Sequence, residues 1–151
     1  MANHPQSTGL PGIKLIKHFE GLCLAKYQDA VSKWTIGYGH LILANEDFSQ
    51  PLTEQQAEQL LLSDLKKSEN GIKKMVTVDL NQNQFDALVS FAFNLGIGNL
   101  QQSTLLKLLN AGKHESAAEQ FIRWDKAGGQ TLPGLTRRRQ AEQKLFCSPI
   151  A

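Results

Sequence analysis

Long apolar runs are missing from this 151-residue chain, which has no uninterrupted apolar stretch long enough to span a bilayer. Low-complexity segments and internal repeats are absent as well. Residues 1–9 (MANHPQSTG) lack the charged start and apolar centre of a secretory signal, and we expect them to form a flexible tail. These absences predict synthesis in the cytoplasm and no stable insertion into a membrane.

An excess of one charge is also lacking, because the formal net charge of +2 is too small to indicate a nucleic-acid partner. The densest basic cluster, Arg137 to Arg139, is typical of a solvated or ion-paired helix face. Cysteine is scarce. Cys23 and Cys147 are accompanied by no CxxC or HExxH pattern, so we expect neither a metal site nor a cofactor. A disulfide between them is conceivable, but two reduced thiols are favoured because cytoplasmic proteins seldom carry structural disulfides.

The segment HFEGLCLAKYQDAVSKWTIGYGHL carries the chemistry that is present. Glu20 follows Ile13 and Ile16 on one face of a predicted helix, and Gly21 is a plausible stop for that helix. A carboxyl group held against apolar surface has its charged form disfavoured, which suits a general acid. The alternative is a glutamate in the last helical turn that points to solvent.

A short hairpin is predicted after this helix, where β-branched and aromatic residues are frequent. From Trp34 onwards the side chains alternate, so that Thr35, Gly37 and Gly39 share one face, and Trp34 and Tyr38 are predicted core residues on the other. Glycines inside a strand often mark the close approach of a ligand, and a sugar ring could lie beside Thr35. A bulge or tight bend without a ligand is the alternative.

Two carboxyl groups in different surroundings suit glycoside hydrolysis, which needs an acid on the leaving oxygen and a carboxylate on the other side of the sugar. Glu20 fits the role of the acid on the leaving oxygen. Asp29, near a polar turn, is expected to stay ionised, and the Thr35 hydroxyl to help hold a water molecule. The three residues together predict a glycosidase.

Four blocks of this sequence, in order, resemble the phage-type lysozymes, or endolysins, of glycoside hydrolase family 24. The first is the pattern Glu, eight residues, Asp, five residues, Thr, which is present as Glu20, Asp29 and Thr35. The others are FDALVSFAFNLGIGNLQQSTLL at 85–106, RWDKAGGQTLPGL at 123–135 and TRRRQAEQKLF at 136–146. The resemblance covers nearly the whole chain. It implies a mostly helical α+β fold with two lobes around a cleft, and a muramidase that cleaves the β-1,4 bond between N-acetylmuramic acid and N-acetylglucosamine in peptidoglycan.

The expected organisation is a single lysozyme-like domain over residues 1–151, with a β lobe at about 22–52, a linking helix at 53–75 and a helical lobe at 76–151 on which the first helix packs. Capping boxes at Thr53 with Gln56 and at Asn81 with Gln84 predict two helix starts. Further helices are predicted at 103–110, 113–127 and 135–146, each next to a glycine or to another breaker.

The family resemblance also implies substrate-binding residues, namely His40, Leu41, Phe93, Asn94 and Ser103. His40 is expected to brace the hairpin through hydrogen bonds rather than to titrate in catalysis. Asn94 would offer its amide to an acetamido group. Without the family, Phe93 is predicted to be a core residue.

The implied partner is the peptidoglycan glycan strand, reached in the host after a separate membrane-permeabilising holin has acted, and we expect a monomer. The family favours inversion of the anomeric centre. Two alternatives stay open. A lytic transglycosylase would use the same glutamate to form a 1,6-anhydro sugar, and a lysozyme-like fold could also serve as a non-catalytic peptidoglycan-binding module.

Overall fold

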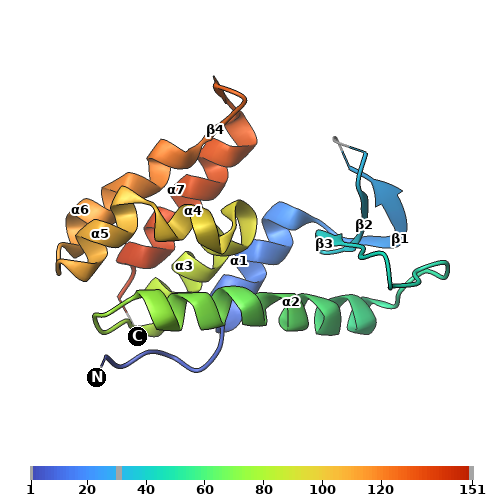
Figure 1. The fold of residues 1–151 in the computed structure, drawn as a ribbon, viewed down its shortest axis with the longest axis horizontal. Helices are drawn as coiled ribbons and strands as arrows, with labels where there is room; N and C mark the ends of the chain where they lie inside the picture. Colours follow the sequence, from blue (N-terminus) through green and yellow to red (C-terminus); the bar gives the residue numbers. More distant parts are fainter. Residues whose placement is uncertain (1, 30–31, 150–151) are drawn as a thin grey trace. The chain divides into compact units, whose positions relative to one another are not determined.

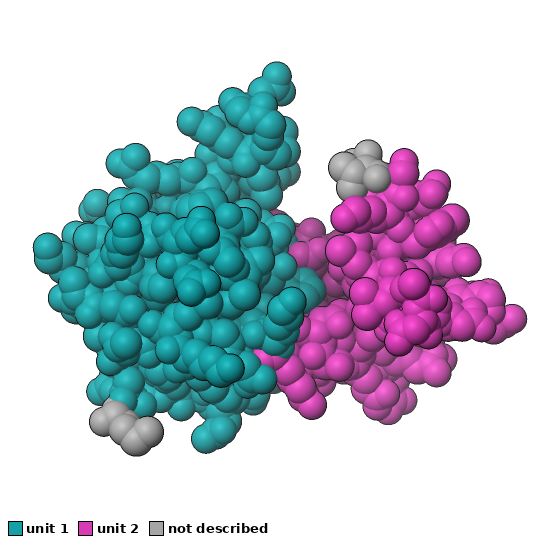
Figure 2. Space-filling view, viewed as in Figure 1, with its two compact units in different colours: residues 1–15, 67–151 teal, residues 16–66 magenta. Residues whose placement is uncertain are grey.

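The computed structural model describes residues 2–29 and 32–149. These residues form a mostly helical α+β fold, and they divide into two compact units, residues 16–66 and residues 1–15 with 67–151 (Figure 2). Helices α1 (Leu10–Glu20) and α2 (Glu54–Met75) each contribute to both units. No helix in the described ranges has both the length and the apolar content that crossing a membrane requires.

The unit of residues 16–66 is built around a small antiparallel sheet in the order β1 (Cys23–Gln28), β2 (Trp34–Gly37), β3 (His40–Leu41) (Figure 1). Helix α1 ends at Glu20, as predicted, because Gly21 adopts φ +72° and its N–H donates to the Lys17 carbonyl. The Thr53–Gln56 capping box that opens α2 is also confirmed. Five side chains, each at most 1% exposed, form the core of this unit: Ile16, Ile36, Ala57, Leu61 and Leu65.

His40 joins the sheet to α2 through Asp64 and to the segment after β3 through Glu46. Its Nδ1 lies 2.8 Å from Asp64 Oδ2 on α2, and its Nε2 lies 2.9 Å from Glu46 Oε1, which also accepts the Leu43 N–H. Burial lowers the pKa of His40, but the hydrogen bonds and charges of Glu46 and Asp64 outweigh burial and raise it above 6.5. Burial raises the pKa of Asp64 despite its contact with His40. This arrangement agrees with the predicted bracing role of His40.

The other unit is helical, with α3 (Gln82–Leu95) as its most buried element. The predicted capping box of Asn81 and Gln84 opens α3, and the helix stops before Gly96 as expected. Residues 85–92 are buried, and α7 (Pro133–Cys147) packs along this helix. The remaining helices of this unit are α4 (Ile97–Gln101), α5 (Thr104–Asn110), α6 (His114–Gln120) and the 3-10 turn η1 (Phe121–Trp124).

The segment predicted to be a flexible tail is hydrogen-bonded to the helical unit. The Thr8 N–H and hydroxyl both donate to Glu69 Oε2, at 2.8 and 2.6 Å. The Gly9 and Gly12 N–H groups donate to the fully buried Asp86 on α3. A Cβ at Gly12 would lie 2.6 Å from the Asp86 Cβ, so glycine permits this close approach of α1 to α3.

Two further sequence predictions, one for residues 113–127 and one for Trp34, differ from the structure. The helix predicted over 113–127 ends at Gln120, and β4 (Lys126–Ala127) then pairs with β5 (Gln130–Thr131). Gly128 and Gly129, at φ +59° and +80°, form the two-residue loop of that hairpin instead of ending a helix. Trp34, predicted as core, is 46% exposed, and the Lys26 ammonium group lies 5.0 Å from its ring centroid.

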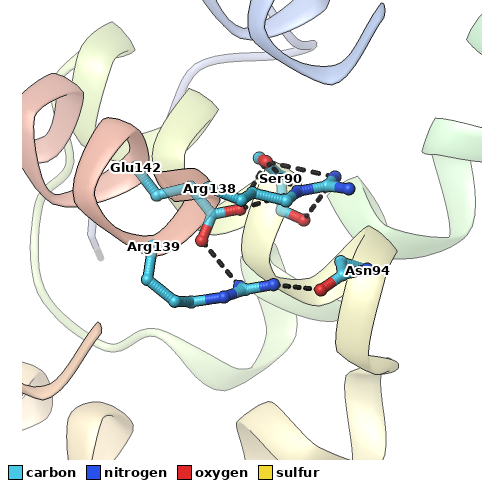
Figure 3. A network of polar contacts seen from close by, with 5 residues as sticks. All are labelled: Ser90, Asn94, Arg138, Arg139 and Glu142. Carbon is cyan, nitrogen blue, oxygen red and sulfur yellow. Dashed lines mark hydrogen bonds and ion pairs between the residues drawn. The ribbon is translucent and has the colours of Figure 1, made fainter. Parts of the chain in front are cut away.

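Arg138 and Arg139 are ion-paired, which is one of the two alternatives predicted for the arginine cluster, but they lie in a buried network rather than on a solvated face (Figure 3). Arg138 lies 3.3 Å from Glu142 and also donates to Ser90 of α3, whose hydroxyl donates to Glu142 Oε2 at 2.5 Å. Arg139 donates to Glu142 Oε1 at 2.6 Å and to the Asn94 Oδ1. The network ties α7 to α3, and only Arg137 of the three arginines is exposed.

Glu142→Gln should lower the free energy of unfolding by about 3 kcal/mol or more, because it leaves two buried guanidinium groups without their carboxylate. Urea unfolding followed by circular dichroism measures the loss. The matched control is Arg137→Gln on the exposed side of the same helix, expected to change stability by less than about 0.5 kcal/mol. Equal effects of the two variants would contradict the structural role of the network.

His40→Asn should destabilise the protein by about 2 kcal/mol at pH 6, and by less as the pH rises. The native-state pKa of His40 is raised, so the stabilisation is fully present below about pH 6.5 and is lost as the pH passes through the native-state value. Unfolding free energies of wild type and variant at pH 6 and pH 9 test this. The exposed His18→Asn is the control, and a His40 effect that grew towards pH 9 would refute the assignment.

Candidate functional site

Glu20 is seated against Gly39, which lies in the turn between β2 and β3. A Cβ built on Gly39 would overlap Glu20 Oε1 and lie 3.2 Å from Glu20 Cδ. Gly39 also has φ +76°, a conformation that glycine adopts without strain. The missing side chain of Gly39 therefore leaves the space that the half-buried Glu20 carboxyl group occupies.

Asp29 and Thr35 are both anchored on the backbone of Lys33. The Lys33 N–H donates to Asp29 Oδ1 at 2.8 Å, and the Lys33 carbonyl accepts the Asp29 N–H at 2.8 Å. The same carbonyl accepts the Thr35 hydroxyl at 3.2 Å. Because the hydroxyl donates its proton there, its lone pairs remain as acceptors. A carboxylate and a hydroxyl acceptor are thus held together by the main chain of one residue.

Tyr27, on β1, responds to the charges of both predicted acids. The pKa of its phenol is raised by burial first, and then by the negative charges of Cys23, Glu20 and Asp29. The phenol is therefore close enough to both carboxyl groups to respond to their charge. Sequence reasoning missed Tyr27, since its pairing with β2 depends on a β-bulge between Cys23 and Tyr27 that the alternation of residues does not reveal.

The glycine face predicted beside Thr35 is only partly as expected. Gly37 is buried, and a Cβ there would meet the side chains of Leu52, Leu60 and Ala57 at 3.7 to 3.8 Å. Gly37 thus lies beneath packed side chains rather than beneath an open surface. Of the strand glycines, Gly39 is the one that meets a predicted catalytic residue.

The predicted substrate-binding residues fall into both units. His40 and Leu41 lie in the unit of residues 16–66 with Glu20, Asp29 and Thr35; His40 is 9% exposed and Leu41 is 48% exposed. Phe93, Asn94 and Ser103 lie in the helical unit.

These three residues of the helical unit differ in how their polar groups are used. Phe93 is half-buried, and Asn94 is exposed with its Oδ1 bound by Arg139, which turns its amide NH2 away from that arginine. The Ser103 hydroxyl is the N-cap of α5: it accepts the Leu106 N–H, donates to the Leu100 carbonyl, and the residue is 2% exposed. Their contact with a glycan stays a prediction.

Within residues 2–29 and 32–149, no group of three or more His, Cys, Asp or Glu side chains could hold a metal ion. Cys23 and Cys147 are both free and exposed. The unit of residues 16–66 holds two carboxyl groups and a hydroxyl group, which is a set of groups for proton transfer and water activation.

Comparison with known proteins assigns the chain to a family. A family model described as phage lysozyme matches residues 17–142. The endolysin of Bacillus phage B103 is 46% identical over 89% of the chain, although the chain spans only 52% of that protein. The endolysin of Salmonella phage P22 is 40% identical over 91% of the chain and 95% of its own length.

Solved structures agree with the fold. A crystal structure of a P22 lysozyme mutant has a TM-score of 0.86 at 35% identity, covering 95% of this chain and all of that one. The muramidase domain of SpmX from Asticaccaulis excentricus has a TM-score of 0.87 at 38% identity, covering 96% of this chain and all of that one.

The predicted lysozyme-like fold is therefore confirmed, as is the predicted relationship to endolysins. The chain spans about half the length of the Bacillus phage relatives and nearly the full length of the P22 endolysin. On the family match and on these identities, the chain belongs to the phage lysozyme family, which consists of glycoside hydrolases of the lysozyme type.

Proposed function

We propose that this chain is an endolysin muramidase that hydrolyses the β-1,4 bond between N-acetylmuramic acid and N-acetylglucosamine in peptidoglycan, and so lyses the host cell. The observation that carries the proposal is the seating of Glu20 on Gly39 within the same unit as the Asp29–Lys33–Thr35 arrangement. The family membership of the chain supports the same reaction class.

Glu20 is the general acid in this proposal. It protonates the glycosidic oxygen as the bond to the anomeric carbon breaks, which lets the sugar leave as an alcohol. Gly39 holds the carboxyl group in a fixed place, and a proton donor must be aimed at the leaving oxygen to within a fraction of an ångström to be effective.

Asp29 and Thr35 act on the attacking water. Asp29 accepts the water proton, and the Thr35 hydroxyl, whose own proton is donated to the Lys33 carbonyl, accepts the second hydrogen of the water. Attack from the face opposite the leaving group inverts the anomeric centre. Inversion requires the carboxyl groups of Glu20 and Asp29 to stand about 6.5 to 9.5 Å apart, so that a water molecule fits between them.

The glycan is held by further residues in this proposal. Leu41 contacts a sugar from the sheet, His40 positions the turn that contains Gly39, and Phe93, Asn94 and Ser103 contribute from the helical unit. The exposed amide of Asn94, oriented by Arg139, suits hydrogen bonding to an acetamido group.

The proposal also covers how the enzyme reaches the bacterial cell wall. In this proposal the enzyme is a monomer that is made in the host cytoplasm and reaches peptidoglycan once a separate holin has permeabilised the membrane. Lysis that required no such partner in a host producing only this chain would contradict this part.

Glu20→Gln should lower the rate of peptidoglycan hydrolysis by about a thousandfold, because the amide cannot donate the proton that the leaving oxygen needs. Digestion of purified peptidoglycan, followed by mass spectrometry of the products, measures the loss. Glu54→Gln, an exposed glutamate on α2, is the control and should leave the rate unchanged.

The products of the wild-type digest decide the reaction class. Hydrolysis yields reducing sugars that retain the added water, whereas a lytic transglycosylase yields 1,6-anhydro products that are one water lighter. Anhydro products, or an unimpaired Glu20→Gln variant, would refute the hydrolase proposal, and a wild type without any turnover would point to the non-catalytic module.

Gly39→Ala should reduce activity by about a hundredfold while the protein still folds, because the new methyl group displaces the Glu20 carboxyl group. Gly112→Ala is the matched control. Gly112 lies between α5 and α6 of the helical unit and has a similar φ of +81°, and a Cβ there meets no atom within 4 Å beyond its chain neighbours, so this variant carries the backbone strain of about 1 to 2 kcal/mol at a position remote in sequence from Glu20.

Turbidity loss of chloroform-treated Gram-negative cells, together with melting temperatures of both variants, separates the two effects. The expected result is comparable destabilisation and a large difference in activity. If Gly112→Ala lost as much activity as Gly39→Ala, the contact between Gly39 and Glu20 would not be the cause.

A further inference from the structure

Three directly paired residues form one transverse row across the sheet, with Thr35 in the middle. Tyr27 on β1 pairs with Thr35 on β2, and Thr35 pairs with Leu41 on β3. Directly paired residues of antiparallel strands project their side chains to the same face of the sheet. Tyr27, Thr35 and Leu41, here called the Thr35 row, therefore share one face.

The two ends of the Thr35 row are exposed and its centre is not. Tyr27 is 37% exposed and Leu41 is 48% exposed, whereas Thr35 is 4% exposed. Neighbouring strands are about 4.8 Å apart, so the two apolar side chains flank the buried hydroxyl at a separation of about 10 Å. A large apolar side chain on each side of a hydroxyl group suits a pyranose ring, which has apolar C–H faces and hydroxyl groups along its edge.

The opposite face of the sheet is used for packing. Ile36 and His40, paired with each other, are buried there, and His40 contacts Asp64 of α2. All six residues of the edge strand β1 are exposed, so Tyr27 is not part of the core that joins the sheet to α2. On the face of the Thr35 row, packing against α2 begins at Gly37, where a Cβ would meet Ala57 and Leu60.

Tyr27 is also the titratable member of the Thr35 row, and its phenol responds to the charges of both predicted acids. The charges of Glu20 and Asp29 both act on its phenol and, with burial, raise its pKa, so that the O–H stays protonated and uncharged at neutral pH. A neutral ring beside two carboxyl groups can contact a sugar without adding a third negative charge to the site.

We infer that Tyr27 is a substrate-contacting residue whose ring packs against the apolar face of an N-acetylated pyranose bound over Thr35, opposite Leu41. The inference rests on the proposed function and extends it to a residue that neither the sequence nor the family resemblance assigned. Tyr27 contributes binding of the sugar, and the chemistry stays with Glu20, Asp29 and Thr35.

The test compares three single variants on sonicated, purified peptidoglycan. Tyr27→Ala should raise KM by about tenfold and leave kcat within about threefold, because it removes a stacking contact made before and during the reaction. Tyr27→Phe keeps the ring and should stay within twofold of wild type in both constants.

Trp34→Ala is the matched control, because Trp34 is an exposed aromatic residue of β2 one position before Thr35. It pairs with Gln28 and projects from the other face of the sheet. The variant should leave KM unchanged. Three results would each overturn the inference: an unchanged KM for Tyr27→Ala, a Tyr27→Phe variant as impaired as Tyr27→Ala, or an equal rise in KM for Trp34→Ala.

A binding arm covers the case in which Tyr27→Ala folds poorly or the chain does not turn over. Sedimentation with insoluble peptidoglycan compares Glu20→Gln with the double variants that add Tyr27→Ala or Tyr27→Leu. Both additions should weaken binding by about three- to tenfold, and unweakened binding of the folded Tyr27→Leu protein would refute the contact. An inactive wild type would refute the proposed hydrolysis alone, whereas an active wild type with unchanged Tyr27 variants would refute this inference alone.

Discussion

The contact between the Glu20 carboxyl group and Gly39 is the constraint on which the rest of the site depends. It requires a helix that stops at the right residue and a turn that carries no side chain, in segments 19 positions apart. Gly21 meets the first requirement by ending α1 in a left-handed conformation. Gly39 meets the second, and His40, held by Asp64 and Glu46, fixes the end of the turn against α2. The Glu20 carboxyl group is thus positioned by Gly21, by Gly39 and by the polar, partly buried contacts of His40 with two carboxylates.

A second constraint is the use of main-chain groups to position reactive side chains. Asp29 and Thr35 are held by the N–H and carbonyl of Lys33, so the identity of that side chain does not enter the geometry. Main-chain groups lose less entropy than long side chains when they are ordered by the strand that contains them. The carboxylate and the hydroxyl therefore reach a mutual orientation that the pairing of β1 with β2 maintains.

Much of this organisation follows from local sequence signals. Both capping boxes and the glycine stops after α1 and α3 lie where the sequence predicts them, because each depends on residues within one helical turn. Features that depend on distant partners were not predictable. The bulge in β1 that sets the register of Tyr27 and the burial of Arg138 and Arg139 require knowledge of which segments pack together. The hairpin at Gly128 and Gly129 is local, but a glycine pair is equally typical of the end of a helix.

The buried network of the helical unit has a role that stability alone does not account for. Taking two guanidinium groups and a carboxylate out of water costs several kcal/mol per ion, and a well-packed apolar cluster would often hold α7 to α3 at least as well. What an apolar cluster could not do is orient Asn94. Arg139 divides its donors between Glu142 and the Asn94 Oδ1, so the ion pair on α7 determines which way the exposed amide on α3 faces (Figure 3). Arginine with its planar fork can serve both partners at once, and lysine, a single point of charge, could not.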